Sequence, residues 1–240
     1  MFMWSEPSME WMEKAEEQTK FFGKIGEILA PYLRNSDMIC EIACGTGLLA
    51  AALSPLVKAI HAVDISPLAL DYMAGHLETK NIKNIRPICG DWKHVSLDKS
   101  YHVVIFSYFS ALLEDFSLLQ QLASRLIIAI LPFSNANSRF SKDDDSRNQR
   151  ETAENAVAFL KQQNIPFQLI ERELEFGQPF SSYDEAMDFM TYYYPHYSHG
   201  DIQHHLNRFL VGEGASLYLP KKKRVGILII ESPHYSVNFL

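Results

Sequence analysis

The most constraining feature of the sequence is the regular alternation of short strand-like runs with segments of helical periodicity. Strand-like runs occur at residues 38–42, 59–63, 85–89, 101–106 and 125–131, and helix-forming stretches or glycine-rich turns separate them. Strands that alternate with helices in this way form a parallel sheet with crossover helices. The pattern therefore predicts an α/β fold with a doubly wound, mostly parallel sheet and helices on both faces.

The second half of the chain continues this pattern but contains an additional segment. Residues 152–163 have helical spacing, residues 167–176 are strand-like, and residues 225–231 form a final apolar strand. Between the last two strands, residues 177–215 predict a helical insertion, with a capping box at Ser182 to Glu185 and a second helix capped by Asp201. We expect one domain over residues 1–240, with a helical lid or flank at residues 1–35 and the insertion as an acceptor cap. Residues 134–150 are rich in Ser, Asn, Asp and Arg and predict an exposed loop.

A glycine-rich motif marks the candidate ligand site. Residues 41–47 read Glu-Ile-Ala-Cys-Gly-Thr-Gly, at the end of the first strand and the start of a helix. Small residues at this place allow a ligand to approach the backbone in the crevice where doubly wound folds bind ligands. The motif also fits the degenerate dinucleotide fingerprint, with Asp64 at a suitable distance to hold a ribose. An NAD(P)-binding oxidoreductase is therefore one possible interpretation.

Three carboxylates around this crevice favour a different ligand. Glu41 ends the first strand, where it would repel the pyrophosphate of a dinucleotide. Asp64 ends the second strand, and Asp91 follows the third, where it can accept hydrogen bonds from an adenine amino group. S-adenosylmethionine suits such a site because its sulfonium and ammonium groups are positive and it carries no phosphate.

On these residues the chain resembles the class I S-adenosylmethionine-dependent methyltransferases, of the type 11, 12 or 25 domain kind. The resemblance covers residues 19–131 well and residues 152–231 in outline, and it implies a seven-stranded sheet whose last strand is antiparallel. It also implies S-adenosylmethionine as cofactor and S-adenosylhomocysteine as product. The implied cofactor-binding residues are Glu41, Ala43, Gly45, Gly47, Asp64, Ile65, Gly90, Asp91, Trp92 and Ser107. In this set Glu41, Gly45 and Gly47 would bind the methionine and ribose side, Asp64 the ribose hydroxyls, and Ile65, Asp91 and Trp92 the adenine. Ala43 stands where the family usually has its first glycine, as it does in related members with the same motif.

The residues after the fourth strand narrow the class of acceptor that is methylated. Residues 107–110 read Ser-Tyr-Phe-Ser and lack the motifs of the base-amino, glutamine, cytosine-C5 and metal-dependent catechol subclasses. We therefore expect a small-molecule acceptor and direct in-line methyl transfer. The insertion carries an aromatic run at residues 192–197, in which Tyr194 and His196 are candidates for acceptor contact or catalysis. Packing of the insertion is the alternative role for these rings.

Two other clusters invite functional interpretations that we do not favour. Asp201 and four histidines (His196, His199, His204 and His205) lack the spacing of a defined metal site, so we expect no bound metal. The run Lys221 to Arg224 resembles a nucleic-acid patch, but it lies between two strand candidates of an acidic chain and predicts a solvated hairpin tip.

Charge and composition narrow the remaining classes. Twenty-nine acidic and 22 basic residues give a net charge of −7, which disfavours a nucleic-acid partner. No apolar run is long enough to cross a bilayer. The first twenty residues predict neither a signal peptide nor a transit peptide. The three cysteines include no C-x-x-C pair and suit a reducing compartment. We expect a cytoplasmic monomer or homodimer that does not bind membranes. Besides the oxidoreductase, a non-catalytic S-adenosylmethionine-binding protein is the alternative from another class, because folds of this kind are also used without turnover.

Overall fold

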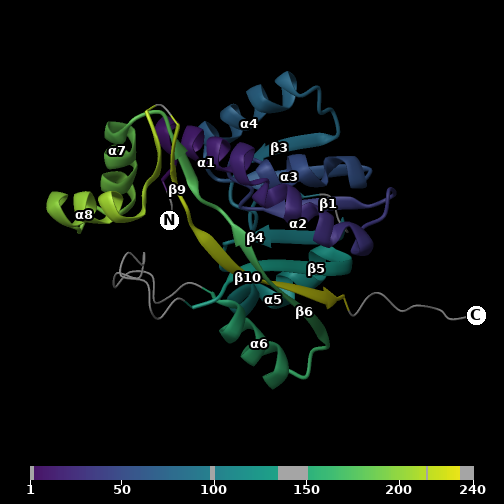
Figure 1. Cartoon of the computed structure of the whole chain (residues 1–240). Helices are drawn as coiled ribbons and strands as arrows, with labels where there is room; N and C mark the ends of the chain where they lie inside the picture. Colours follow the sequence, from purple (N-terminus) through teal and green to yellow (C-terminus); the bar gives the residue numbers. More distant parts are fainter. Residues whose placement is uncertain (1–2, 98–100, 135–150, 215, 233–240) are drawn as a thin grey trace, which may run out of the picture.

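The computed structural model describes residues 3–97, 101–134, 151–214 and 216–232, and seven of the described strands form one sheet (Figure 1). The strand order is β3-β2-β1-β4-β5-β10-β6. Strands β1 to β5 pair in parallel, whereas β10 is antiparallel to both β5 and β6. The strands are β1 (Met38–Ile42), β2 (Ala59–Asp64), β3 (Ile85–Cys89), β4 (Tyr101–Ser107), β5 (Ala123–Pro132), β6 (Phe167–Glu175) and β10 (Lys222–Glu231). This arrangement confirms the predicted α/β fold with an antiparallel last strand.

Helices cover both faces of the sheet, so the central strands are buried on two sides. One core layer contains Phe21, Leu49 and Met73 from three helices on one face, and the other contains Leu119 and Leu160 from two helices on the opposite face. Each fully buried side chain of this size stabilises the fold by about 1.5–3 kcal/mol. The helices are α1 (Glu6–Thr19), α2 (Phe21–Leu29), α3 (Leu48–Leu53), α4 (Pro67–Thr79), α5 (Leu112–Leu122) and α6 (Ala153–Gln162), with short 3-10 turns at Ala30–Tyr32 and Ser54–Leu56.

The predicted insertion forms a small unit of its own, which we call the cap (residues 178–219). It contains β7 (Gln178–Phe180), α7 (Tyr183–Tyr193), α8 (His199–Phe209), β8 (Val211–Glu213) and β9 (Ser216–Leu219). Besides the two predicted helices it therefore carries a three-stranded sheet, in the order β7-β9-β8. The cap has its own apolar core, including Phe180, Met190 and Leu206.

The N-terminal ends of the cap helices only partly follow the predicted capping. Ser182 caps α7 as expected, since its hydroxyl accepts the backbone N–H of Glu185 at 3.1 Å. The predicted capping box is incomplete, because the Glu185 carboxylate accepts the N–H of Ser181 and not that of Ser182. Helix α8 begins earlier than expected, because Ser198 rather than Asp201 is its N-cap. The Ser198 hydroxyl accepts the backbone N–H of Asp201, which places Asp201 in the first turn, where a carboxylate is stabilised by the helix dipole.

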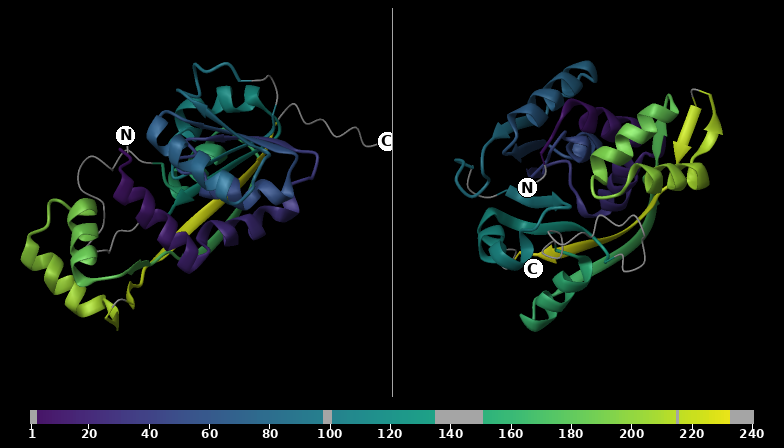
Figure 2. Two further views of the ribbon diagram at one scale, coloured as in Figure 1. Left: turned by 90° about the horizontal axis from the view of Figure 1, so that it is seen from above. Right: turned by 90° about the vertical axis from the view of Figure 1, so that its left-hand side faces the viewer.

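The cap is attached at the edge where the parallel strands end. In the register of β6 and β10, Glu175 lies opposite Lys222, and Val225 of β10 lies opposite Pro132 at the end of β5. Figures 1 and 2 show the cap beside α1 at this edge, with the long β6 and β10 strands leading to it. The basic residues Lys222 to Arg224 therefore belong to β10 and not to a hairpin tip, which corrects that prediction. The loop predicted at residues 134–150 lies, apart from Ser134, outside the described residues.

Candidate functional site

The glycine loop between β1 and α3 has the backbone conformation that its sequence predicts. Ala43, Gly45 and Gly47 all have positive φ, at 54°, 55° and 72°. A β-carbon on Gly45 would overlap the ring of Trp4, and one on Gly47 would overlap the sulfur of Met73, so neither position has room for a side chain. Ala43 adopts a left-handed conformation that glycine takes more easily, which places a strained residue at the strand end.

Asp64 holds the glycine loop in place from the end of β2. Its Oδ2 accepts the backbone N–H of Gly45 at 2.7 Å, and its Oδ1 accepts the N–H of Ser66 at 2.9 Å. The carbonyl of Asp64 also accepts the N–H of Gly90 at 2.9 Å, which fixes the end of β3 beside it. Each carboxylate oxygen can accept a second hydrogen bond, so Asp64 can position the loop and still accept two ligand hydroxyls.

Glu41 is a buried carboxylate without a complete set of partners. Only 2% of the residue is exposed, and its Oε2 atom makes no hydrogen bond. Burial, together with the nearby charge of Asp64, raises the pKa of Glu41 to about 8, against a smaller lowering by a backbone hydrogen bond from Ala50. A buried carboxylate in this condition is stabilised by a cation that reaches Oε2. Glu41 is therefore a candidate contact for a positively charged ligand group.

The residues predicted to bind the adenine differ in how accessible they are to a ligand. Ile65 is 49% exposed and its neighbour Leu68 is 41% exposed, which leaves apolar surface beside Asp64. Asp91 is accessible, but its oxygens already accept the N–H of Lys93 at 3.0 Å and contact Nδ1 of His94 at 2.9 Å. The hydrogen bond from Lys93 contributes most to lowering the pKa of Asp91.

The other residues predicted on the adenine side lie in two different settings. Trp92 is 6% exposed and packs into the core layer that also contains Phe116 and Leu119, so most of its ring is covered by protein. Gly90 has φ 149° and lies at the turn that leads to Asp91. Exposed apolar side chains suit a stacked ring, and Leu68, which the sequence reasoning did not single out, offers the same kind of surface as Ile65.

At the end of β4 the structure adds residues that the sequence reasoning did not assign. Ser107 ends the strand, and Tyr108 follows with a left-handed φ of 53° and a buried hydroxyl that has no hydrogen-bond partner. The ammonium of Lys223 lies 5.0 Å from the Tyr108 ring centre, 5.4 Å from that of Phe21 and 3.7 Å from that of Phe176. No pattern in the sequence marks Tyr108, because its strain and burial arise from contacts between distant segments.

The two catalytic candidates of the cap occupy different environments. Tyr194 is 6% exposed and packs in the core of the cap, where its hydroxyl accepts a hydrogen bond from Lys221 Nζ at 3.0 Å. His196 is exposed, in the turn between α7 and α8. Within the described residues, no group of three or more His, Cys, Asp or Glu side chains is arranged to hold a metal.

The arrangement fits S-adenosylmethionine and fits a dinucleotide poorly. Glu41 has an unpartnered oxygen for an ammonium group, and Asp64 has acceptor capacity for ribose hydroxyls. The positive φ values of the glycine loop give a ligand access to the backbone. A pyrophosphate would instead be repelled by the carboxylate of Asp64 and would find no positive charge at Glu41.

Comparison with known proteins agrees with this interpretation. Residues 39–126 match the family described as "Methyltransferase domain", a segment that contains all three carboxylates. An S-adenosylmethionine-dependent methyltransferase from Aquifex aeolicus has the same fold, with 11% identity, a TM-score of 0.54 and coverage of 95% of this chain and 100% of that chain. The search of curated proteins found no match.

Two further solved structures share the fold and act on different acceptors. One is a precorrin-6y C5,15-methyltransferase from Geobacter metallireducens, with 11% identity, a TM-score of 0.52 and coverage of 86% and 88%. The other is a tRNA (m1A58) methyltransferase from Aquifex aeolicus, with 13% identity, a TM-score of 0.51 and coverage of 87% of this chain and 68% of that chain. Residues 39–126 thus match a methyltransferase-domain family, and the chain as a whole has the fold of the class I S-adenosylmethionine-dependent methyltransferases, which use S-adenosylmethionine as their cofactor.

Proposed function

We propose that this enzyme methylates a small-molecule acceptor held between the carboxyl ends of the strands and the cap. The observation that carries the proposal is that the basic side chains at that edge are paired with other groups of the protein. Lys222 pairs with Glu173, Arg224 pairs with Glu171, and Lys221 donates to the Tyr194 hydroxyl. Together with Lys223, which lies over three aromatic rings, these side chains make contacts within the protein. Lys222 and Arg224 are exposed, but each is paired with a glutamate carboxylate, so the positive charge that a phosphate backbone would need is largely neutralised at this edge. This favours a small acceptor over RNA.

In the proposed site, Glu41 holds the α-ammonium of the cofactor and Asp64 holds the ribose hydroxyls. Ile65, with Leu68, supports the adenine ring, and Asp91 lies where it would accept from the adenine amino group. Ala43, Gly45 and Gly47 bring the backbone close to the ligand, and Gly90 and Ser107 border it at the ends of β3 and β4. The cofactor supplies a methyl group on a sulfonium, from which the acceptor nucleophile takes the methyl carbon as the carbon–sulfur bond breaks. The protein contributes alignment of the two reactants and exclusion of water.

We propose different roles for the two candidate residues of the cap, because one is exposed and the other is buried. We assign acceptor contact, or removal of the acceptor proton, to the exposed His196, and a packing role to Tyr194. Replacing His196 with Ala should reduce turnover with little effect on the free energy of unfolding. Replacing Tyr194 with Ala should destabilise the cap, because a large ring is removed from its core.

The test offers two pools of acceptors to the same protein. The enzyme is incubated with methyl-labelled S-adenosylmethionine and one of two acceptor pools. One pool is a metabolite extract of molecules below about 3 kDa, and the other is total RNA from the same cells. We expect label in the low-mass pool, and we expect it to be lost with Glu41→Gln. Label that enters RNA and is released by nuclease would contradict the small-molecule proposal.

A further inference from the structure

The segment before α1 lies directly on the glycine loop. The Trp4 ring is so close to Gly45 that a β-carbon there would overlap its Cζ2 atom, with two further ring atoms at 3.2 and 3.3 Å. Gly45 is also the residue whose N–H donates to Asp64. The indole therefore borders the place where the proposed cofactor contacts of Glu41 and Asp64 meet.

Both neighbours of Trp4 in the chain are bonded to the same side chain of the cap. The hydroxyl of Ser5 donates to the Tyr192 hydroxyl at 3.1 Å, and the Tyr192 hydroxyl donates to the carbonyl of Met3 at 3.2 Å. Ser5 is also the N-cap of α1, so the path of the chain from Trp4 into the helix is fixed. Tyr192 thus bonds to the residues on either side of Trp4, through the backbone carbonyl of Met3 and the side-chain hydroxyl of Ser5.

Further along α1, aromatic packing strengthens this attachment. The ring centre of Trp11 lies 5.2 Å from that of Phe189, 5.7 Å from that of Tyr192 and 6.0 Å from that of Tyr193. Trp11 is 7% exposed and so lies largely away from water, whereas Tyr192 at the rim of the cluster is 40% exposed. Edge-to-face pairs at such distances contribute beyond the area that they bury.

The same helix is also bonded to the cofactor half of the molecule. Glu13 accepts a hydrogen bond from the Tyr72 hydroxyl and pairs with Nδ1 of His76 at 2.7 Å. Tyr72 and His76 belong to α4, the helix that directly follows Asp64. Helix α1 therefore connects the cap with the half of the fold that carries the ribose-binding carboxylate.

From these contacts we propose that Trp4 is a further residue of the cofactor-binding site and that Tyr192 is the positioning residue that holds it there. This inference rests on the cofactor positions proposed above. The indole face is the best aromatic partner for a positive charge, and S-adenosylmethionine is a cation with both a sulfonium and an ammonium group. The ring covers the glycine loop and shields the bound cofactor from water.

The first test measures binding of S-adenosylmethionine and of S-adenosylhomocysteine by calorimetry. We expect Trp4→Ala to weaken binding of S-adenosylmethionine about tenfold, and Trp4→Phe to weaken it less because an aromatic face remains. Met3→Ala is the matched control, since that side chain is 81% exposed and only its backbone carbonyl bonds to Tyr192. Unchanged affinity in Trp4→Ala, with the wild type binding normally, would overturn the role of Trp4.

A double-mutant cycle tests the role of Tyr192. Tyr192→Phe removes the hydroxyl that bonds to Met3 and Ser5, and we expect about threefold weaker cofactor binding. Because Tyr192 acts through Trp4, the same change made in Trp4→Ala should cause no further loss. An equal loss in both backgrounds would show that Tyr192 acts independently and would overturn its positioning role. Failure of the wild type to bind either compound would instead contradict the proposed cofactor site itself, so the two failures are distinguishable.

Discussion

At the residue scale, the buried carboxylate of Glu41 is the most informative group of the site. It lies one residue before the end of β1 and has an unpartnered oxygen, and burial raises its pKa to about 8. An ammonium bound at that oxygen would favour the ionised form and lower the pKa again. Cofactor binding and ionisation of Glu41 are therefore expected to be linked.

The first prediction is that cofactor binding below about pH 8 releases a proton, in an amount approaching one per site. Calorimetric titration in two buffers of different ionisation enthalpy measures this number directly. In Glu41→Gln the release should disappear and the affinity for S-adenosylmethionine should fall. Glu27→Gln, an exposed substitution on α2, should leave both unchanged. Equal proton release in wild type and Glu41→Gln would contradict the linkage.

The second prediction concerns stability without cofactor. The folded pKa of Glu41 lies above its ordinary value of 4.5, so the contribution of Glu41 to stability is fully present below pH 4.5 and is lost as pH rises through about 8. The free energy of unfolding, measured by urea titration, should therefore fall across this window by a few kcal/mol more in wild type than in Glu41→Gln. Parallel pH profiles of the two proteins would rule out ionisation of Glu41 as the cause.

Some site residues were predictable at this scale and others were not. Asp64 and Asp91 follow short strand-like runs, so their positions at one sheet edge came directly from the strand pattern. The orphaned oxygen of Glu41 and the strain at Tyr108 depend on tertiary packing, which no local pattern encodes. The contact between Trp4 and Gly45 joins segments 41 positions apart and has no signal in the sequence.

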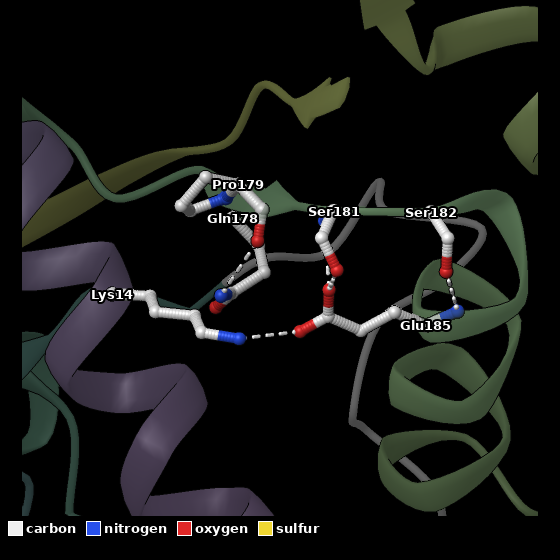
Figure 3. A network of polar contacts seen from close by, with 6 residues as sticks. All are labelled: Lys14, Gln178, Pro179, Ser181, Ser182 and Glu185. Carbon is white, nitrogen blue, oxygen red and sulfur yellow. Dashed lines mark hydrogen bonds and ion pairs between the residues drawn. The ribbon is translucent and has the colours of Figure 1, made fainter. Parts of the chain in front are cut away.

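At the element scale, an ion pair attaches helix α1 to the cap, in addition to the packing of Trp11 against the aromatic rings of α7. Figure 3 shows Lys14 of α1 reaching Glu185 of α7, where Nζ and Oε1 are 2.7 Å apart. The other oxygen of Glu185 accepts the N–H and the hydroxyl of Ser181, both at 2.7 Å. Burial opposes ionisation of this group, but the hydrogen bonds from Lys14 and Ser181 outweigh it and lower the pKa of Glu185 to about 2.

The third prediction is that Glu185→Gln destabilises the protein by about 1–3 kcal/mol at pH 7, because a charge-assisted network is lost. Since the folded pKa is lowered, this contribution is present above about pH 4.5 and disappears as pH falls toward 2. Glu173→Gln is the matched control, because its pair with Lys222 is exposed and should contribute less than about 1 kcal/mol. Equal shifts of the urea midpoint in the two variants would argue against a structural role for the Lys14–Glu185 pair.

Element types followed well from the sequence, whereas element ends and attachments did not. The apolar runs predicted the central strands because a buried parallel strand is apolar on both faces. The start of α8 was misplaced because Ser198 and Asp201 are both good capping residues, and only the fold shows that Ser198 has the extended backbone of an N-cap. The three cap strands are short, and their pairing depends on partners distant in the sequence.

At the scale of the whole molecule, the carboxyl and amino edges of the parallel strands carry different groups. The carboxyl edge carries the glycine loop and the carboxylates, whereas the amino edge is held by a buried ion pair between Arg125 and Asp37. Arg125 also donates to the carbonyl of Tyr32 at 3.0 Å. A cavity of about 450 Å³ lies at this amino edge, lined by residues that include Arg125 and Phe167, and so lies away from the glycine loop. None of the described helices is long and apolar enough to span a membrane.

The fourth prediction is that a substitution at the amino edge of the sheet changes stability without changing cofactor binding at the carboxyl edge. Arg125→Met should lower the free energy of unfolding by about 3–5 kcal/mol, because Asp37 then remains as an uncompensated buried charge. The affinity for S-adenosylhomocysteine of the folded protein should be unchanged. Arg172→Met, an exposed substitution on β6, should alter neither quantity by more than about 0.5 kcal/mol. A large loss of affinity in folded Arg125→Met would show that the two edges are coupled.

The chain leaves the sheet at Glu175 and re-enters it at Lys222, two residues that face one another across neighbouring antiparallel strands. A short turn could close that gap without changing the register of either strand, and the entropic cost of a longer connection grows slowly with its length. The cap can thus be exchanged without altering the strands, and under the function proposed above such an exchange would change acceptor preference while the half with the glycine loop is retained. Any replacement module must still supply counterparts of Glu185 and Tyr192, because α1 depends on both for its attachment.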